Sequence, residues 1–216
     1  MSKVFFEISM SLDGFVAGPN PRFDEPLGDG GEQLHEWVFE QDSWREAHGV
    51  EGEGGVAGAE DAFLKESLER TGATIMGRGM FGGGGGEWDL SWQGWWGDEP
   101  PFRRPVFVLT HHPREPLTLA DTTFTFVTDG IESALEQARA AAGDRDVAIA
   151  GGAEVGQQYL AAGLVDEIKL HIAPLFLGEG TRLFENHVGE GPVRLDRANV
   201  VESDFGVAHA VYRLPG

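Results

Sequence analysis

One junction constrains the fold of this chain more than any other segment. Strand-forming residues at positions 146–150 stop at Gly151 and Gly152, and a helical pattern then runs to Leu160. Glycine lets the backbone approach a ligand closely, and the free N–H groups of a helix N-terminus attract anions. The junction is therefore typical of a phosphate site, although a tight strand-to-helix turn without a ligand would also explain the two glycines.

Strand and helix patterns alternate along most of the chain. Strands are predicted at residues 4–10, 73–76, 106–110, 123–128, 147–150 and 165–172, and helices at residues 31–45, 60–70, 131–142 and from the glycine junction to near Gly163. Two further strands, near residues 193–203 and 206–214 with a break around Asp204, form a closing antiparallel hairpin. This order predicts an α/β fold in three layers, with a mostly parallel central sheet, helices on both faces and a single domain over residues 1–216.

Charge and composition exclude several classes of function. The chain carries 36 acidic and 16 basic residues, a formal net charge of −20, which argues against a nucleic-acid partner. It has no cysteine, so disulfides, thiolate nucleophiles and Cys-ligated metals are excluded. No apolar run has the length of a membrane span, and the first residues lead into a strand without a signal-peptide pattern. We expect a cytoplasmic protein with no membrane partner.

Glycine and polar residues gather where the predicted strands end, which is where such sheets bind ligands. They are Ser11, Asp13, Gly14, Gly77, Arg78, Thr110, His111, His112, Thr128, Gly151 and Gly152. An arginine, hydroxyl groups and two glycine turns suit a phosphorylated ligand, such as a dinucleotide. The sequence has no Gly-x-x-x-x-Gly-Lys-Ser/Thr motif, and Gly151-Gly152 is not part of a Gly-x-Gly-x-x-Gly fingerprint. Arg78 has an alternative role in a salt bridge, although a guanidinium matches phosphate geometry better than lysine does.

Metal and hydrolase chemistry are not expected. His111 and His112 are neighbours on an extended segment, so their side chains point to opposite faces and cannot share an ion. A Gly-x-Ser-x-Gly elbow is missing from the sequence.

A loop at residues 82–101 combines five consecutive glycines with Trp88, Trp92, Trp95 and Trp96. Glycine runs favour mobility, whereas tryptophans need a surface to cover. The loop could be a lid over a flat ligand, a contact in a dimer or a packed surface loop.

Several segments resemble the dihydrofolate reductase-like superfamily in order and spacing. They are residues 75–78 (Ile-Met-Gly-Arg), 107–110 (Phe-Val-Leu-Thr) and 149–160. The order and spacing of the matching segments hold over nearly the whole chain. Residues 11–14 (Ser-Leu-Asp-Gly), 165–168 (Val-Asp-Glu-Ile) and 174–184 look more like one branch of it. That branch is the reductase domain of riboflavin biosynthesis, the C-terminal domain of a bifunctional deaminase-reductase, and its stand-alone bacterial relatives. The zinc motif of the deaminase is absent, so the bifunctional form is excluded.

The resemblance implies NADPH as the cofactor. Gly77 and Arg78 would meet the phosphates on the adenosine side, and Thr110 and His111 would lie beside the 2′-phosphate. The glycine junction would hold the pyrophosphate, and residues 13–18 would border the nicotinamide. The implied cofactor-binding residues are Gly14, Val16, Gly18, Gly77, Arg78, Thr110, His111, Thr128, Gly151, Gly152, Ala153, Glu154 and Val155.

The sequence also departs from true dihydrofolate reductases. Their acidic residue on the first helix is either absent or replaced by Glu36, their strand threonine aligns with Leu170, and their tyrosine after the glycine turn is Gly156. Arg104 matches the arginine that holds the glutamate of folate, with a surface ion pair as its alternative role. The implied substrate-binding residues are Trp88, Trp96, Arg104 and Gly156.

We therefore expect an NADPH-dependent reductase that transfers a hydride to a C=N or C=O group of a small heterocycle. The type that the resemblance implies is 5-amino-6-(5-phosphoribosylamino)uracil reductase. Asp13, which could equally be a turn former, and then Glu36 are the candidate catalytic residues. Authentic dihydrofolate reductase and a non-catalytic nucleotide-binding protein are the alternatives. A homodimer is compatible with the resemblance, because relatives in the riboflavin pathway tend to pair.

Overall fold

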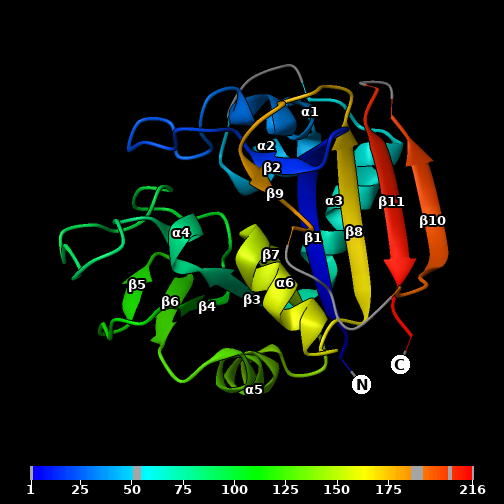
Figure 1. Ribbon diagram of the computed structural model, residues 1–216. Helices are drawn as coiled ribbons and strands as arrows, with labels where there is room; N and C mark the ends of the chain where they lie inside the picture. The colour runs from blue at the N-terminus through cyan, green and yellow to red at the C-terminus, as the bar shows by residue number, and fades with distance from the viewer. Residues whose placement is uncertain (1, 51–54, 186–191, 204–205, 216) are drawn as a thin grey trace.

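The computed structural model describes residues 2–50, 55–185, 192–203 and 206–215. Within them, one nine-stranded sheet has the order β10-β11-β8-β1-β7-β3-β4-β6-β5, and β2 pairs with β9 in a small second sheet (Figure 1). The strands are β1 (Val4–Ser11), β2 (Phe15–Ala17), β3 (Thr71–Gly77), β4 (Pro105–Leu109), β5 (Leu117–Leu119), β6 (Thr122–Val127), β7 (Asp146–Gly151), β8 (Glu167–Ala173), β9 (Thr181–Arg182), β10 (Asp196–Glu202) and β11 (Ala208–Arg213).

Helices lie on both faces of the large sheet, as the sequence predicts. They are η1 (Gly31–His35), α1 (Glu36–Phe39), α2 (Asp42–Ala47), α3 (Ala59–Arg70), α4 (Arg78–Phe81), α5 (Ile131–Ala142) and α6 (Ala153–Ala161). The helices α5 and α6 cover one face, and α3 runs behind the sheet with α1 and α2 above it (Figure 1). None of the described helices combines the length and the apolar character that crossing a bilayer requires.

Six neighbouring strands run parallel. They are β8, β1, β7, β3, β4 and β6, and their carboxyl ends therefore share one edge of the sheet. The C-terminal hairpin of β10 and β11 is antiparallel, which confirms the prediction. The sequence prediction missed β5, a three-residue strand that pairs antiparallel with β6 at the opposite side of the sheet.

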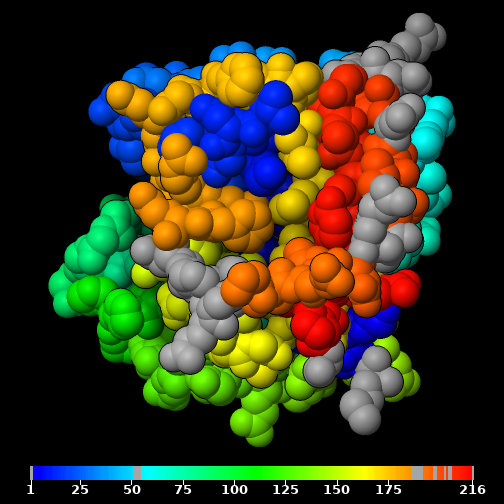
Figure 2. Space-filling view, turned by 45° about the vertical axis from the view of Figure 1, so that its right-hand side comes forward, coloured from blue at the N-terminus to red at the C-terminus, as the bar shows by residue number. Residues whose placement is uncertain are grey.

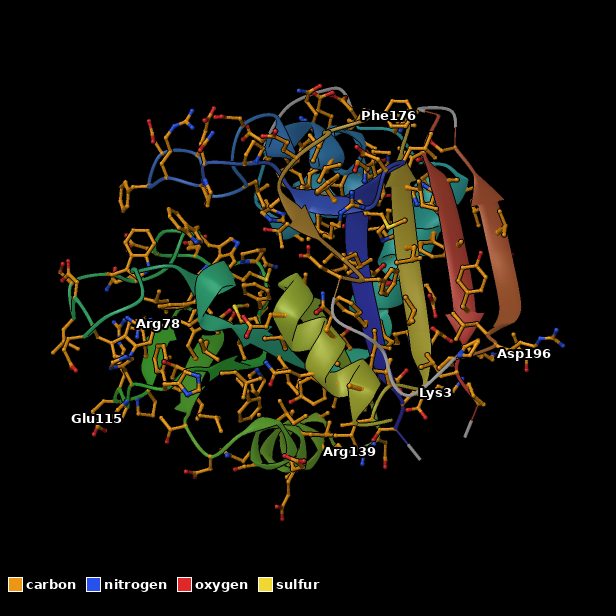
Figure 3. The ribbon with its side chains drawn as sticks, in the orientation of Figure 1. Lys3, Arg78, Glu115, Arg139, Phe176 and Asp196 are labelled. Atoms are coloured by element: carbon orange, nitrogen blue, oxygen red, sulfur yellow. The ribbon has the colours of Figure 1, made fainter. Side chains whose placement is uncertain are left out.

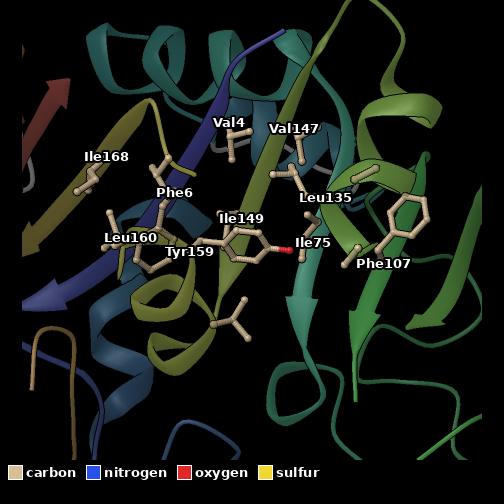
Figure 4. Close-up of a cluster of buried hydrophobic side chains, with 14 of the residues drawn as sticks. Val4, Phe6, Ile75, Phe107, Leu135, Val147, Ile149, Tyr159, Leu160 and Ile168 are labelled. Carbon is tan, nitrogen blue, oxygen red and sulfur yellow. The ribbon is translucent and has the colours of Figure 1, made fainter. Parts of the chain in front are cut away.

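The core lies between the sheet and the helices α5 and α6 (Figure 4). Val4, Phe6, Ile149 and Tyr159 are fully buried there. The Tyr159 hydroxyl satisfies its hydrogen-bonding capacity by donating to the carbonyl oxygen of Ile131 at 2.7 Å. Burial of these side chains removes apolar surface from water, which is the main stabilising contribution to such a core.

The single helix predicted at residues 31–45 is in fact three short ones. Gln41 has an extended backbone (φ −78°, ψ 137°) between α1 and α2, and its side-chain amide donates to the Trp37 carbonyl at 2.9 Å. Leu34 and Trp37 are nevertheless both buried, as the pattern predicts. Residues 51–54, between α2 and α3, and Asp204 at the predicted hairpin break lie outside the described residues.

Arg70 fixes the opposite, amino edge of the parallel sheet. Its guanidinium donates to Asp146 at the start of β7 and to Glu167 at the start of β8, each at 2.7 Å. These pairs are largely shielded from solvent, so they tie the end of α3 to two strands.

Candidate functional site

The centre of the carboxyl edge is the glycine junction. Gly77 ends β3 beside Gly151, which ends β7, and the peptide bond between Gly151 and Gly152 is cis. A Cβ on Gly77 would lie 2.8 Å from a methyl carbon of Val155, so the close approach of β3 to α6 requires glycine. Val155 thus contributes packing and its backbone amide rather than a ligand contact through its side chain.

The N-terminus of α6 is open toward one side of this junction. Gly152 caps the helix without a side-chain hydrogen bond, and a Cβ added there would meet no atom within 4 Å. Helix N-termini carry unsatisfied N–H groups and a partial positive charge. Gly152, Ala153 and Glu154 can therefore offer backbone donors to an anion.

Arg78, the first residue of α4, brings a charge to the same edge (Figure 3). Its guanidinium lies 3.8 Å over the ring of Trp88, and its three nitrogens are buried without a hydrogen-bond partner among the described residues. The predicted alternative of a salt bridge is therefore not what the described residues form. Burial lowers the pKa of this guanidinium, and the charge of Glu87 only partly opposes that. A buried cation without a partner is costly, which favours binding of an anion.

Arg114, which the sequence analysis missed, is a second cation at this position. Its guanidinium lies 5.1 Å from the centre of the Trp88 ring, and it donates to the Trp92 carbonyl at 2.7 Å. One of its other nitrogens is buried without a partner among the described residues. Two guanidinium groups near one indole ring form a positively charged corner after the end of β3.

The residues predicted beside a 2′-phosphate, Thr110 and His111, follow β4, and Thr128, another predicted cofactor-binding residue, follows β6. The Thr110 hydroxyl accepts a hydrogen bond from the His112 amide at 3.1 Å and so shapes the turn after β4. His111 and Thr128 are exposed at the same edge. Among the described residues, no hydrogen bond joins the side chain of His111 or Thr128 to Arg78 or Arg114.

The Gly/Trp loop is packed onto the sheet. Trp96 stacks on Phe124 with ring centres 6.0 Å apart and also contacts Phe102, which places it away from the glycine junction. A Cβ on Gly82 would lie 2.6 Å from the Trp95 ring. This arrangement is that of the predicted packed surface loop, and it gives Trp96 a structural role in place of the predicted substrate contact.

Asp13 holds the loop that follows β8. Its carboxylate accepts hydrogen bonds from the Ser11 hydroxyl at 2.5 Å, the Leu177 amide at 3.1 Å and the Gly178 amide at 2.8 Å. The bond from Ser11 is the main reason that the pKa of Asp13 lies below its usual value. Figure 2 shows the segment after β8 folded against the blue segment that includes β2, and β9 in that segment pairs with β2. These contacts are those of a turn former that also clamps a loop.

Glycine is required at two of the positions that follow Asp13. Gly14 has a positive φ of 89°, and Gly18 lies so close to the Asp29 carbonyl that a side chain there would collide with it. Val16 is part of the core, so its side chain does not contact a ligand.

A cavity of about 180 Å³ adjoins the glycine junction under η1 and α1. Its lining comprises Glu7, Ile8, Ser9, His35, Trp37, Val38, Ala150 and His171. Ala150 immediately precedes the junction, so the cavity and the α6 N-terminus are neighbours. A ligand held at the junction can extend a flat group into this space.

Apart from His35 of η1, the ionisable groups of the cavity belong to β1 and β8. Glu7 accepts hydrogen bonds at Oε1 from the Ser67 hydroxyl at 3.0 Å and from His171 Nε2, which lies 3.2 Å away. Burial by itself raises the pKa of Glu7, but the hydrogen bonds and charges of His171, Lys169 and Ser67 outweigh it, so the net pKa is lowered. The cavity therefore contains a carboxylate that is ionised at neutral pH.

The sequence analysis missed these cavity residues, although one signal was present. Glu7 and His171 are ionisable residues inside strands that otherwise read as buried, and buried ionisable groups cluster at functional sites. Leu170, aligned with the strand threonine, belongs to the core cluster that contains Phe6, while its neighbour His171 lines the cavity.

Three predicted site residues lie elsewhere. Glu36 is exposed, and its neighbours His35 and Trp37 line the cavity in its place. Arg104 precedes β4 at the amino edge, where it donates to the carbonyls of Leu68 and Thr71 at 3.0 and 2.9 Å, so its assignment to the substrate is wrong. Gly156 is also wrong as a substrate contact, because it is buried on the side of α6 that faces the Phe6 ring.

Comparisons with known proteins agree with this architecture. A family model described as the RibD C-terminal domain matches residues 2–207. A search of the curated proteins found no match. Among solved structures, a putative riboflavin biosynthesis protein from Shewanella sp. PV-4 has 22% identity and a TM-score of 0.64, with 100% of both chains covered.

Two longer structures match over somewhat more than half of their own length. A diaminohydroxyphosphoribosylaminopyrimidine deaminase/5-amino-6-(5-phosphoribosylamino)uracil reductase from Thermotoga maritima has 15% identity and a TM-score of 0.61, covering 99% of this chain and 57% of that one. RibD from Acinetobacter baumannii has 16% identity and a TM-score of 0.58, covering 100% of this chain and 59% of that one. At such identities the likeness establishes the fold alone.

Proposed function

Because the chain belongs to the RibD C-terminal domain family, we propose that it is an NADPH-dependent reductase of a small heterocycle. The reaction is hydride transfer to a C=N or C=O group, of the 5-amino-6-(5-phosphoribosylamino)uracil reductase type. The observation that carries the proposal is the buried guanidinium of Arg78, which has no partner among the described residues and lies at the carboxyl edge of the sheet.

The residues at this edge fit a dinucleotide that carries an extra phosphate. Backbone amides at Gly152, Ala153 and Glu154 would hold the pyrophosphate at the start of α6. Arg78 and Arg114 would hold the 2′-phosphate, since planar guanidinium groups match phosphate oxygens. Because the chain has a net charge of −20, an anionic cofactor needs localised cations such as these two arginines.

The cavity is the proposed place of the reaction. Bound NADPH supplies the hydride, while the chain orients the two reactants and excludes water. Ile8, Trp37 and Ala150 provide apolar walls, and Glu7 provides a charged group. Asp13 supports the rim through the loop that it clamps rather than through a contact with the reacting atoms.

Dihydrofolate reductase is the second candidate. The sequence supported it only through Glu36 as a replacement for the missing acid, and Glu36 is exposed. The cavity contains the carboxylate of Glu7 instead. A carboxylate in this position can accept hydrogen bonds from the N–H groups of a pterin as well as from those of a pyrimidine. Both substrates therefore belong in the same assay.

Two measurements test the proposal. Tryptophan fluorescence during titration with NADPH and with NADH should show tighter binding of NADPH, because only NADPH carries the 2′-phosphate. If neither binds below about 1 mM, the cofactor assignment is wrong. Oxidation of NADPH is then followed with 5-amino-6-(5-phosphoribosylamino)uracil and with dihydrofolate. A protein that binds NADPH but reduces neither would instead match the non-catalytic alternative.

A further inference from the structure

A row of hydrogen-bonded ionisable side chains leads away from the cavity between the sheet and α3. It begins at Glu7, whose Oε1 lies 3.2 Å from His171 Nε2. His171 Nδ1 lies 2.7 Å from His209 Nδ1, and His209 Nε2 lies 2.8 Å from Glu60 Oε1. His171 is only 4% exposed, His209 0% and Glu60 6%, so water does not compete for these contacts.

The strand register builds this row. His171 on β8 is the direct antiparallel partner of His209 on β11, and paired residues on one face of a sheet have adjacent side chains. The rings of Trp37 and Phe63 enclose the two imidazoles, with ring centres 4.7 to 5.7 Å from theirs. Hydrogen bonds in such a shielded place are stronger than in water.

The contacts fix the number of protons in the row. Each of the three hydrogen bonds needs one proton between its two atoms, and a ring nitrogen can either donate or accept. With both carboxylates ionised, three protons on two imidazoles make one imidazole neutral and the other an imidazolium. Moving the middle proton from one Nδ1 to the other transfers that positive charge between the rings without any large movement.

The two ends of the row differ in their surroundings. Glu7 lines the cavity, and both of its side-chain hydrogen bonds end on Oε1, so Oε2 has no partner among the described residues. Glu60 lies in the first turn of α3, directly after the exposed residues 55–59. One end thus meets the ligand cavity, and the other lies next to the surface.

We propose that Glu7, His171, His209 and Glu60 form a proton relay that supplies the cavity from the surface near the start of α3. The inference rests on the proposed reductase function. Hydride from the dihydronicotinamide adds to the carbon of a C=N or C=O group, which oxidises the nicotinamide and places the electron pair on nitrogen or oxygen. His171 passes the proton on its Nε2 to the Glu7 carboxylate, and Glu7 delivers it to that atom. The middle proton moves from His209 Nδ1 to His171 Nδ1, and a proton from solvent enters through Glu60 and restores the three protons of the row.

The charged groups around the relay keep Glu7 from holding its proton between turnovers. Lys169 donates to Ser67 at 2.7 Å and to Glu66 at 2.6 Å, and Ser67 in turn donates to Glu7. His35 also lines the cavity. Glu7 is therefore a temporary carrier, whereas the two histidines hold the transferable proton.

The decisive variant is His209→Gln, because an amide can keep a hydrogen bond but cannot pass a proton on. With 5-amino-6-(5-phosphoribosylamino)uracil as the probe, kcat should fall about 100-fold, in the range for lost acid–base catalysis. The KM of the probe and the Kd of NADPH should stay within about twofold, and the solvent deuterium isotope effect on kcat should rise. The control is His48→Gln, an exposed residue directly after α2 and outside the relay.

Two outcomes would overturn the relay. One is a His209→Gln protein that retains kcat within about twofold and an unchanged isotope effect, which would leave His209 a purely packing role. If His209→Gln fails to fold, the same comparison is made with Glu60→Gln. That substitution is the smallest change in the row and keeps the hydrogen bond. The other is nitrogen NMR of ¹⁵N-histidine protein in which both imidazoles are neutral at every pH between about 5 and 9, where histidine ordinarily titrates.

The NMR result also separates this inference from the proposed function. Failure of the unmodified protein to oxidise NADPH with either substrate, combined with one shared charge on the two imidazoles, would count against the reductase function alone. Normal activity combined with two neutral imidazoles would count against the relay alone.

Discussion

The guanidinium of Arg78 lies 3.8 Å over the indole ring of Trp88. The face of an indole attracts a cation, so this contact holds the charge at the end of β3 before any anion binds. Trp88 is itself fixed by a hydrogen bond from its Nε1 to the His112 carbonyl at 2.8 Å. The pair therefore forms a prearranged anion site at the sheet edge.

Replacing Arg78 with glutamine should weaken NADPH binding by about 1–3 kcal/mol, the usual contribution of a charged hydrogen bond. NADH affinity should change less, because NADH lacks the 2′-phosphate. Fluorescence titration of both nucleotides measures the difference, and Arg139→Gln on the exposed face of α5 is the control (Figure 3). Equal losses of affinity for the two nucleotides would show that Arg78 does not bind the 2′-phosphate.

Gly156→Ala should destabilise the fold by about 1–3 kcal/mol, as overpacking of a core does. The added methyl group would collide with the fully buried Phe6 ring. Denaturant unfolding measures the loss, and Gly79→Ala is the matched helical control because a Cβ there meets nothing within 4 Å. The double variant Phe6→Leu with Gly156→Ala should show less than the sum of the two single losses; strict additivity would contradict this packing.

Much of the fold follows from patterns that lie within a few residues of one another. The helix over Ile131–Ala142 and the strand–glycine–helix junction are local, because periodicity and glycine placement encode them. The strand β5 is too short to show a period, and the break at Gln41 depends on a bridge to Val56 that is remote in sequence. Such tertiary contacts override local helix preference.

The candidate site also has one part that the sequence predicts and one part that it does not. Gly152 and Arg78 could be predicted because each lies directly after a predicted strand, where ligands bind. The relay could not, since His171 and His209 are 38 residues apart and Glu7 and His171 are 164 apart. Only the register of β1, β8 and β11 brings these side chains together. The substrate role predicted for Arg104 was wrong for a related reason. Its partners are the carbonyls at the end of α3, which lie next to it only in the folded chain.

Asp13→Asn should loosen the loop after β8 while leaving the cofactor site in place. The amides of Leu177 and Gly178 donate to the Asp13 carboxylate, so their hydrogen exchange should accelerate in the variant. The lowered pKa of Asp13 sets the pH window. The carboxylate stabilises the loop above its ordinary pKa of 3.8 and loses that effect as the pH falls through its lower folded value. Unchanged exchange at both amides would contradict the clamp.

His35→Gln should make the protein less sensitive to mild acid. Burial lowers the pKa of His35 from 6.5 to about 4, and the charge of His171 adds to the shift. Between these values the unfolded chain binds a proton that the folded chain refuses, so acid favours unfolding. The unmodified protein should therefore lose about 2–3 kcal/mol from this residue between pH 7 and pH 4.5, and His35→Gln should retain that stability. Asp13 titrates at lower pH, which keeps the two effects apart. Denaturant unfolding of both proteins at the two pH values measures the difference, and equal losses would mean that His35 titrates normally in the folded state.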